Sequence, residues 1–398
     1  MCVSDSSRRD PLPPVPYLNS MSFAHVVGHE RCIAVLRRAI ASARIPQAYL
    51  FCGPNNVGKT LSALTFAKAV NCAEPRAGAE FPDACDGCAS CTKVAAGTHP
   101  DVTVVGPVTR LGSGEETDGA DIYVEGTMIR TEQVGGLIAS AHLTPVEGRR
   151  KVFIVQHAEA MNDASANRLL KTLEEPPGAT TFVLTTQSPS QLLPTIQSRC
   201  QWLRFGPVPE NVAVERLQTD LPTLRGDVIA AAVSLSDGRF GWARTVLSHP
   251  PLLQMREAVL QTASSLPSLE LVQALPYAEQ LIEAAEQWWL TVAGEELGAE
   301  ALRRQRDRVL RAQVGELLGV LLSWFRDVAL ACARPDAREL VNADWAEQLR
   351  VAAERCDPMA AHIACRTIGE TRRFIQTGNA NLRLALEVMF IKLIRGSR

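Results

Sequence analysis

Four cysteines, Cys72, Cys85, Cys88 and Cys91, lie close enough in the sequence to bind one metal ion together. Their spacing, C-x12-C-x2-C-x2-C, contains two overlapping CxxC turns, and four thiolates can surround Zn²⁺ tetrahedrally at about 2.3 Å. Such a site leaves no position for water or substrate, so the pattern predicts a structural zinc rather than a catalytic one. Buried or redox-active thiols are the alternative. We expect His99 to be packed rather than to be a ligand.

Residues 53–60, GPNNVGKT, match the phosphate-loop pattern GxxxxGK[ST]. They follow a strand-like run, AYLFC, and precede a helical run, as a phosphate loop requires. The glycines let backbone N–H groups approach phosphate oxygens, Lys59 reaches the terminal phosphates and Thr60 can ligate Mg²⁺. A relic loop that only caps a helix is the alternative. The predicted nucleotide-binding residues are Gly53, Asn55, Asn56, Val57, Gly58, Lys59 and Thr60.

The acidic groups that ATP hydrolysis needs are incomplete in this sequence. An acidic residue at the end of a second strand should hold the metal ion, and a neighbouring carboxylate should polarise the attacking water. The strand-like run KVFIV (151–155) is followed by Gln156 and His157, and the first carboxylate after it is that of Glu159. We therefore expect ATP with Mg²⁺ to be bound without turnover, or the site to be vestigial.

Arg199 stands in a Ser-Arg-Cys triplet directly before a strand-like segment, CQWLRF. A single arginine is usually a solvated or ion-paired surface group. An arginine that projects from a subunit edge can instead neutralise the phosphates of a nucleotide on a neighbouring chain. The triplet by itself does not indicate this second role, which depends on the other motifs of the sequence.

Alternating strand-like and helical segments must position these motifs, and they predict a parallel sheet covered by helices. The Gly-rich, acidic segment 110–126 is expected to be a surface loop or an insertion. The segment LLKTLEEPP (169–177) should continue a helix that its two prolines end. The short β-rich runs lie at 48–52, 102–105, 151–155 and 181–186.

After residue 206 the pattern is helical to the end of the sequence, with Pro250 and Pro251 at an expected boundary. Two segments there carry apolar residues at steps of three and four, which predicts a helical bundle or an oligomer interface. These residues are Leu310, Val314, Leu317, Leu321, Phe325 and Val328 in one segment, and Leu382, Leu386, Met389 and Leu393 in the other.

Composition sets further limits. A chain of 398 residues exceeds what one hydrophobic core usually organises, and 41 basic against 43 acidic residues produce no overall positive field that would indicate nucleic-acid binding. The Ser- and Pro-rich residues 1–22 are expected to be disordered, with translation starting at Met1 or Met21. No run approaches the roughly 20 apolar residues that cross a bilayer, so we expect a soluble, cytoplasmic protein without membrane contact.

Taken in order, the motifs resemble the clamp-loader branch of the AAA+ family of P-loop ATPases. The resemblance covers nearly all of the chain from residue 23 onward and implies three domains. These are a nucleotide-binding core (23–206, with a zinc module at 72–91), a small helical lid (207–250) and a helical collar (251–398) that joins five subunits. The motifs are FAHVVGHE, GPNNVGKT, the cysteine cluster, HPDV, LLKTLEEPP, TTQ, SRC and NANLRLALE.

Within that family, degenerate motifs favour the delta-prime type over the gamma/tau motor type. Gln156 and His157 replace the acidic pair, and Gly241 stands where a sensor arginine would be expected, with Arg239 out of register. The chain also ends soon after the collar-like helix. The resemblance thus implies a non-polymerising subunit of the bacterial DNA polymerase III clamp loader, in which Arg199 acts in trans on the ATP of a neighbour.

The partners implied by the resemblance are the gamma/tau and delta subunits and, through the complex, the sliding clamp and primed DNA at the nucleoid-associated replisome. An active gamma/tau-type ATPase is the main alternative, favoured by Lys59 and Thr60. A zinc-dependent nucleic-acid binder is a third possibility. The interior of the cysteine cluster, DGCASC, lacks the basic and aromatic residues that such a binder needs.

Overall fold

The computed structural model describes residues 22–76, 83–113, 121–125, 128–175, 177–293, 295–334, 340–377 and 381–396. The chain divides into two compact units, Met1–Val212 and Ala213–Arg398. Of the segment 1–22, expected to be disordered, residues 1–21 lie outside the described part, and Ser22 is described and buried. Among the described helices, none is long and apolar enough to cross a membrane.

A parallel five-stranded sheet forms the centre of the first unit. The strands are arranged in the order β2-β5-β6-β1-β7, and every neighbouring pair is parallel. All four β-rich runs of the sequence are strands, as predicted, and the segment after Arg199 supplies the fifth. The strands are β1 (Ala48–Cys52), β2 (Val102–Val105), β5 (Lys151–Val155), β6 (Thr180–Thr186) and β7 (Gln201–Arg204).

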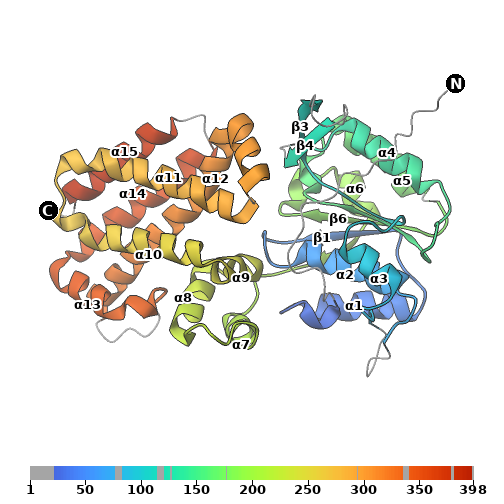
Figure 1. Cartoon of the computed structure of the whole chain (residues 1–398), viewed down its shortest axis with the longest axis horizontal. Coiled ribbons are helices and arrows are strands. Elements are labelled where there is room, and N and C mark those ends of the chain that lie inside the picture. Colours follow the sequence, from blue (N-terminus) through green and yellow to red (C-terminus); the bar gives the residue numbers. More distant parts are fainter. Residues whose placement is uncertain are drawn as a thin grey trace. The chain divides into compact units, whose positions relative to one another are not determined.

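Helices cover both faces of this sheet because successive residues of a strand point to opposite sides. Tyr49 and Phe51 pack into one hydrophobic cluster, and Ala48 and Leu50 pack into the other. The first face carries α1 (Glu30–Ala41), α2 (Lys59–Asn71) and α3 (Ala89–Ala95), and the second carries α4 (Thr131–Ala141), α5 (Asp163–Glu174) and α6 (Pro194–Arg199) (Figure 1). Strands β1, β5 and β6 are buried along their whole length, as two-sided cover requires.

The segment between β2 and α4 differs from its prediction. Here β3 (Val108–Ser113) and β4 (Asp121–Glu125) pair antiparallel as a separate two-stranded sheet. The expected insertion is present, but a loop is the wrong description of its two ends, because they hydrogen-bond to each other. Residues 114–120 between them lie outside the described part. Three short 3₁₀ turns complete the unit: η1 (Phe23–His25), η2 (Ala158–Ala160) and η3 (Pro189–Gln191).

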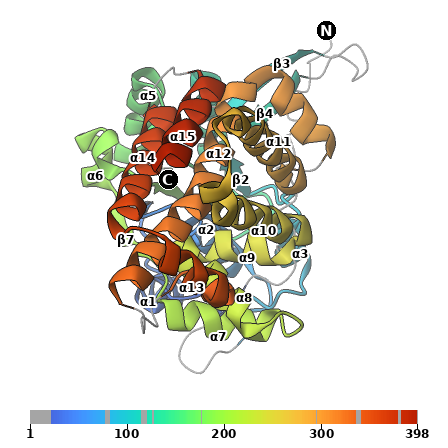
Figure 2. The same cartoon turned by 90° about the vertical axis from the view of Figure 1, so that its left-hand side faces the viewer.

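The described residues of the second unit are helical, as predicted. Helices α11, α12, α14 and α15 contact one another and form a bundle (Figure 2). The two predicted apolar stripes are buried in α12 and α15. The helices are α7 (Glu210–Asp220), which begins at the end of the first unit, α8 (Gly226–Ser236), α9 (Phe240–Ser248), α10 (Pro250–Ser265), α11 (Ala274–Ala293), α12 (Glu295–Ala333), α13 (Ala346–Arg355), α14 (Pro358–Thr377) and α15 (Leu382–Gly396), with η4 (Leu266–Ser268), η5 (Leu271–Gln273) and η6 (Ala343–Trp345) between them.

Buried polar contacts hold together the helices that follow the predicted boundary at residues 250–251. Arg256 of α10 is buried and donates hydrogen bonds to both carboxylate oxygens of Asp344, at 2.7 and 2.8 Å, and to Asn342. The buried Asp327 of α12 accepts from the backbone N–H groups of Val341 and Asn342. The predicted lid and collar fall within one compact unit, so the three-domain division stays a prediction.

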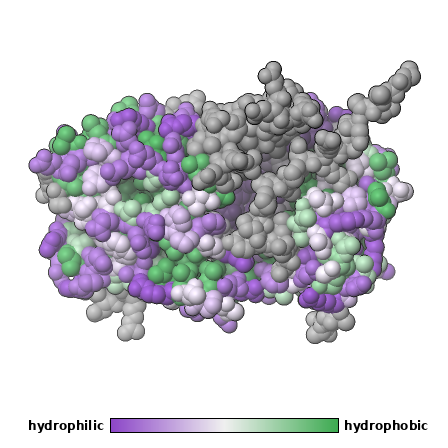
Figure 3. Space-filling view, in the orientation of Figure 1, coloured by the Kyte–Doolittle hydropathy of each residue, from purple (hydrophilic) through white to green (hydrophobic). Residues whose placement is uncertain are grey.

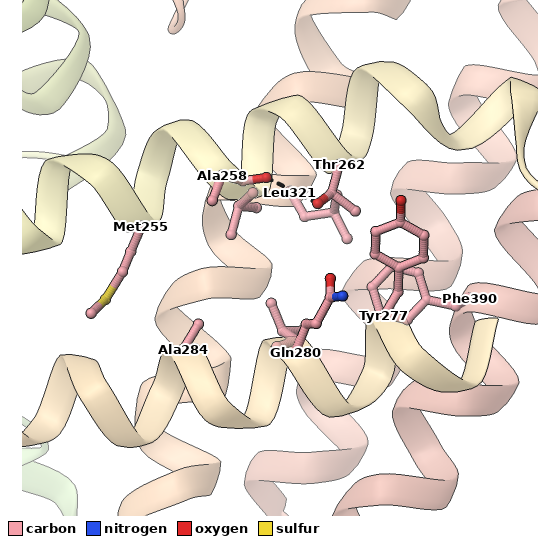
Figure 4. A pocket seen from close by; sticks show the side chains of 10 residues that line it. Met255, Ala258, Thr262, Tyr277, Gln280, Ala284, Leu321 and Phe390 are labelled. Carbon is pink, nitrogen blue, oxygen red and sulfur yellow. Dashed lines mark hydrogen bonds between the residues drawn. The ribbon is translucent and has the colours of Figure 1, made fainter. Parts of the chain in front are cut away.

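A small cavity of about 100 Å³ lies between α10 and α11. Its polar lining atoms come from Thr262, Tyr277 and Gln280, and apolar side chains such as those of Leu321 and Phe390 form most of the rest (Figure 4). Because this lining carries no acid–base pair, we assign the cavity no catalytic role. On the surface shown in Figure 3, hydrophobic residues are interspersed among hydrophilic ones.

Candidate nucleotide site and cysteine cluster

Two glycines in the loop between β1 and α2 have backbone conformations that favour glycine over other residues. Gly53 has φ 151°, and a Cβ atom there would lie 1.8 Å from the carbonyl oxygen of Phe205. Gly58 caps α2 with φ 112°, a conformation that favours glycine. The backbone can therefore form a phosphate-binding turn at the N-terminus of a helix, where N–H groups point outward and the helix dipole favours an anion.

Lys59 begins α2 and is buried at the base of the loop. Its ammonium group donates hydrogen bonds to the carbonyl oxygens of Gly53 and Pro54, at 2.6 and 2.5 Å. Burial lowers the pKa of Lys59 to about 8, against the opposing effect of the Glu159 carboxylate. Lys59 therefore sits inside the loop, close to the position of the phosphates that such a loop binds. Thr60, the next residue of the helix, is half-buried.

His29, which was not predicted from the sequence as a site residue, stabilises the loop from outside. Its Nε2 atom lies 2.7 Å from the carbonyl oxygen of Val57, and its ring packs edge-on against Phe205, with centroids 4.8 Å apart. Because a carbonyl only accepts, Nε2 carries the proton. Burial lowers the pKa of His29, which favours the neutral ring. The sequence feature that could have identified His29 was its position in the motif GHE, directly before α1.

The residues after β5 point in different directions. The backbone N–H of Gln156 donates to Val105 of the neighbouring strand, and its side-chain oxygen lies beside Gly106. His157 adopts a left-handed conformation with φ 49°. Neither residue supplies a carboxylate, so this strand end lacks the acidic pair that holds a metal ion and activates water in ATP hydrolysis.

Glu159 is the carboxylate that the structure brings to this site. Its Oε1 atom accepts from the backbone N–H of Gln187 at 3.2 Å and lies 3.6 Å from Nδ1 of His157. Burial would raise its pKa, but His157, Thr186 and the Gln187 N–H outweigh burial and lower the pKa to about 2. Glu159 is therefore ionised at neutral pH. Its Oε2 atom is buried and has no hydrogen-bond partner among the described residues.

Arg199 lies at the other edge of the sheet from the phosphate loop. It ends α6, directly before the start of β7, whereas the loop follows the end of the adjacent parallel strand β1. A strand of four residues separates these edges by about 13 Å. The Arg199 side chain is about one-third exposed, and its guanidinium forms a 2.6 Å ion pair with Glu174 and donates to the carbonyl of Thr195. The structure thus does not bring Arg199 to the chain's own loop.

The predicted sensor position contains no free arginine side chain. Arg239, in the second unit, donates two hydrogen bonds to Glu316 of α12, at 2.9 and 3.0 Å, and lies over the ring of Trp242. Gly241, two residues later, has no side chain to reach a ligand. Arg239 therefore has a packing role within its own unit.

The four cysteines converge on one point. Their sulfur atoms all lie within 4.8 Å of one another, and two pairs, Cys72 with Cys88 and Cys85 with Cys91, are 3.9 Å apart. A tetrahedron with bonds of about 2.3 Å has edges of about 3.8 Å. The cluster can therefore hold a metal ion, and the donor set suits Zn²⁺.

Backbone donors prepare these sulfurs to bind as thiolates. The N–H of Cys85 points to the sulfur of Cys72 at 3.3 Å, and that of Cys88 points to the sulfur of Cys85 at 3.2 Å. Burial alone would raise the pKa of Cys88, but backbone N–H groups of Cys91 and Ala73 lower it to about 6. The pKa values of Cys72 and Cys91 are raised, mainly by burial. A bound cation would favour all four thiolates.

A buried ion pair attaches the cluster to the helix of the phosphate loop. Lys68 of α2 has a fully buried side chain and lies 2.6 Å from the carboxylate of Asp86, which stands between Cys85 and Cys88. Asp83 attaches the same segment to η1, because its carboxylate accepts from the backbone N–H of Phe23. Neither contact was predicted from the sequence. Lys68 is the single charged residue in the run LSALTFAKAV (61–70), and this feature could have indicated a buried, paired lysine.

His99 is packed, as expected, and the following acidic residue organises a loop. The His99 ring lies 3.0 Å from the hydroxyl of Ser90 and accepts from the backbone N–H of Asp101. The buried Asp101 carboxylate accepts from three successive backbone N–H groups, those of residues 146–148, at 2.7–2.9 Å. Burial opposes ionisation, but these donors and Lys151 lower the pKa of Asp101.

The sheet order, the phosphate loop after β1 and the helices on both faces define a P-loop ATPase fold of the AAA+ class. Residues 28–209 match the family described as "DNA polymerase III, delta subunit". The chain is 36% identical over 187 residues to the DNA polymerase III subunit delta' of Bacillus subtilis, which covers 47% of this chain and 50% of that protein. It is 38% identical over 197 residues to the delta' subunit of Pseudomonas aeruginosa, covering 49% and 54%.

A longer and weaker similarity extends to the motor branch. The chain is 27% identical over 392 residues to the DNA polymerase III subunit tau of B. subtilis, covering 94% of this chain and 62% of that protein. The matches to delta' proteins span about half the length of those relatives. Together these matches show that residues 28–209 are similar to DNA polymerase III subunits of the delta-prime type.

Proposed function

We propose that the whole chain acts as a delta-prime-type, non-motor subunit of a bacterial DNA polymerase III clamp loader. It would assist ATP-driven loading of a sliding clamp on primed DNA without polymerising. The gamma/tau and delta subunits would be its partners, and the assembly would work in the cytoplasm at the replisome on the nucleoid. Similarity of the first unit to delta' proteins supports this proposal.

The location of Arg199 carries the proposal. This arginine lies at the sheet edge opposite the chain's own phosphate loop, so its charge cannot serve a nucleotide bound there. A neighbouring subunit that presented its nucleotide to this edge would receive a guanidinium in trans. To act there, Arg199 would exchange the carboxylate of Glu174 for phosphate oxygens, both of which guanidinium binds well.

The remaining sites have supporting roles in this proposal. Cys72, Cys85, Cys88 and Cys91 would hold one structural Zn²⁺ and thereby fold residues 72–91 against α2. The loop at 53–60 would bind ATP with Mg²⁺, in which the metal ion neutralises phosphate charge. Because Gln156 and His157 offer no carboxylate, this chain would retain the nucleotide rather than hydrolyse it.

The test is clamp-dependent ATP turnover by the assembled loader containing Arg199→Ala. An arginine finger contributes about 10³-fold or more to the rate at its site. The variant should therefore lose nearly all ATP turnover at the one nucleotide site that faces Arg199, and total turnover should fall by the fraction which that site contributes. Arg44→Ala is the matched control, because Arg44 is exposed and precedes β1 at the same sheet edge. Its turnover should equal that of the wild type.

Complex formation, measured by gel filtration, must be retained in both variants. Unchanged turnover in an intact complex with Arg199→Ala would refute the trans role of Arg199. The alternative function is a gamma/tau-type motor, which the 27% identity to tau and the phosphate loop favour. Steady ATP hydrolysis by the purified chain, abolished by Lys59→Ala, would favour that alternative.

A further inference from the structure

We propose that Glu159 is the carboxylate through which the phosphate loop of this chain recognises the metal ion of a metal–nucleotide complex. The inference rests on the nucleotide binding in the proposed function and assigns a residue that lies outside the usual acidic pair. It concerns affinity for Mg²⁺ with ATP, not hydrolysis.

The structure holds the Glu159 carboxylate near the phosphate loop. The two positions directly after β5 carry an amide and an imidazole, and the Gln156 side chain lies beside Gly106. Glu159 lies in the short turn η2, directly after these two positions. Its negative charge raises the pKa of Lys59, against the effect of burial. The backbone N–H of Gln187, just after β6, holds its Oε1 atom at 3.2 Å. The carboxylate is thus fixed between two strand ends.

The other carboxylate oxygen of Glu159 has an environment that favours a bound cation. Oε2 of Glu159 is buried and has no hydrogen-bond partner among the described residues. Because only 13% of the side chain is exposed, water solvates this oxygen poorly. A buried charged oxygen without a partner is costly, and a nearby cation removes that cost. The ammonium of Lys59 is directed to the carbonyls of Gly53 and Pro54 instead.

Phosphate binding would change the balance of charge between Lys59 and Glu159. In a phosphate loop the lysine turns to the terminal phosphates, so Lys59 cannot then neutralise Glu159. Polyphosphate without a metal ion would place its negative charge near the Glu159 carboxylate and be repelled. Mg²⁺ is bound in such sites by one or two carboxylates together with substrate phosphates, which removes this repulsion. Glu159 therefore makes nucleotide binding depend on the metal ion.

The experiment measures ATP binding to the zinc-loaded full chain by calorimetry, once with Mg²⁺ and once in metal-depleted buffer without chelator. The readout is the ratio of the two dissociation constants. Groups that support a bound metal change its affinity by about 10- to 100-fold, and we expect a wild-type ratio in that range. Glu159→Gln keeps the acceptor for Gln187 and loses the charge, so the ratio should fall well below the wild-type value while metal-free ATP binds more tightly.

The controls separate this role from a structural one. A merely structural loss would weaken binding under both conditions and leave the ratio unchanged. Glu175→Gln is the matched variant, because Glu175 is an exposed carboxylate in the same unit, and it should keep the wild-type ratio. Lys59→Ala should abolish binding under both conditions. A wild-type ratio in Glu159→Gln would overturn the inference alone. If the wild type binds no ATP, the nucleotide part of the proposed function fails, and the inference fails with it.

Discussion

Two ion pairs in the first unit have the same length and differ in burial, which allows a matched test of the attachment between α2 and the cysteine cluster. Lys68 and Asp86 are 2.6 Å apart, with side chains 0% and 14% exposed. Lys93 and Glu147 are also 2.6 Å apart, with side chains 44% and 34% exposed. The perturbations are Asp86→Asn and Glu147→Gln, each of which removes one carboxylate charge at nearly constant shape.

The magnitudes follow from solvation. Asp86→Asn leaves the Lys68 ammonium buried without its counter-charge, and breaking a buried pair costs about 3–5 kcal/mol. The slight exposure of Asp86 reduces the expected loss to about 2–4 kcal/mol. Glu147→Gln should cost at most about 1 kcal/mol, because water solvates both partners. Asp86 has φ 64°, and asparagine tolerates this conformation well, so backbone strain does not confound the comparison.

The assay is scanning calorimetry of the zinc-loaded chain, with hydrogen exchange by mass spectrometry over 59–91 to locate the change. For a unit of this size, 1 kcal/mol corresponds to about 2–4 °C, so a loss of about 2–4 kcal/mol in Asp86→Asn should lower the melting temperature by about 4–16 °C. Glu147→Gln should lower it by less than about 4 °C. If Asp86→Asn lowers it no further than Glu147→Gln, burial does not set the strength of this contact, and our reasoning is refuted.

Two other predictions concern acid and metal. Because the folded pKa of Asp101 lies below its ordinary value of 3.8, its stabilisation is complete above that value and is lost as pH falls through the lower folded pKa. Asp101→Asn should therefore cost about 2–3 kcal/mol at pH 7, and urea unfolding should show the variant and the wild type converging in strong acid. Chelation of zinc should raise hydrogen exchange over 83–91 and leave α12 protected, and Cys88→Ser should do the same. Equal exchange before and after chelation would contradict a structural metal.

Much of the fold followed from local patterns in the sequence. Continuous apolar runs marked the strands, because a strand with helices on both faces is buried throughout. Apolar residues at steps of three and four marked the buried faces of α12 and α15 for the equivalent reason in helices. The segment 110–126 was less accessible to this reasoning. Its Gly-rich composition indicated a loop, but pairing between β3 and β4 outweighed that local preference.

Residue spacing alone was sufficient for two of the candidate sites. The phosphate loop is one contiguous turn, and the cysteine cluster contains two overlapping CxxC turns, so the local geometry of each follows from residues near in sequence. The sequence also showed that the acidic pair after β5 is missing. Each of these conclusions depends on neighbours along the chain, which a single sequence displays directly.

Only the tertiary structure decided how distant charges meet. Strand order places Arg199 at the edge opposite its own phosphate loop and lets it pair with Glu174. Lys68 with Asp86, and Glu159 with Gln187, are likewise separated along the chain and joined by folding. A local pattern records which side chains are charged. Their partners and burial, which determine the energy of each charge, depend on how the strands and helices pack.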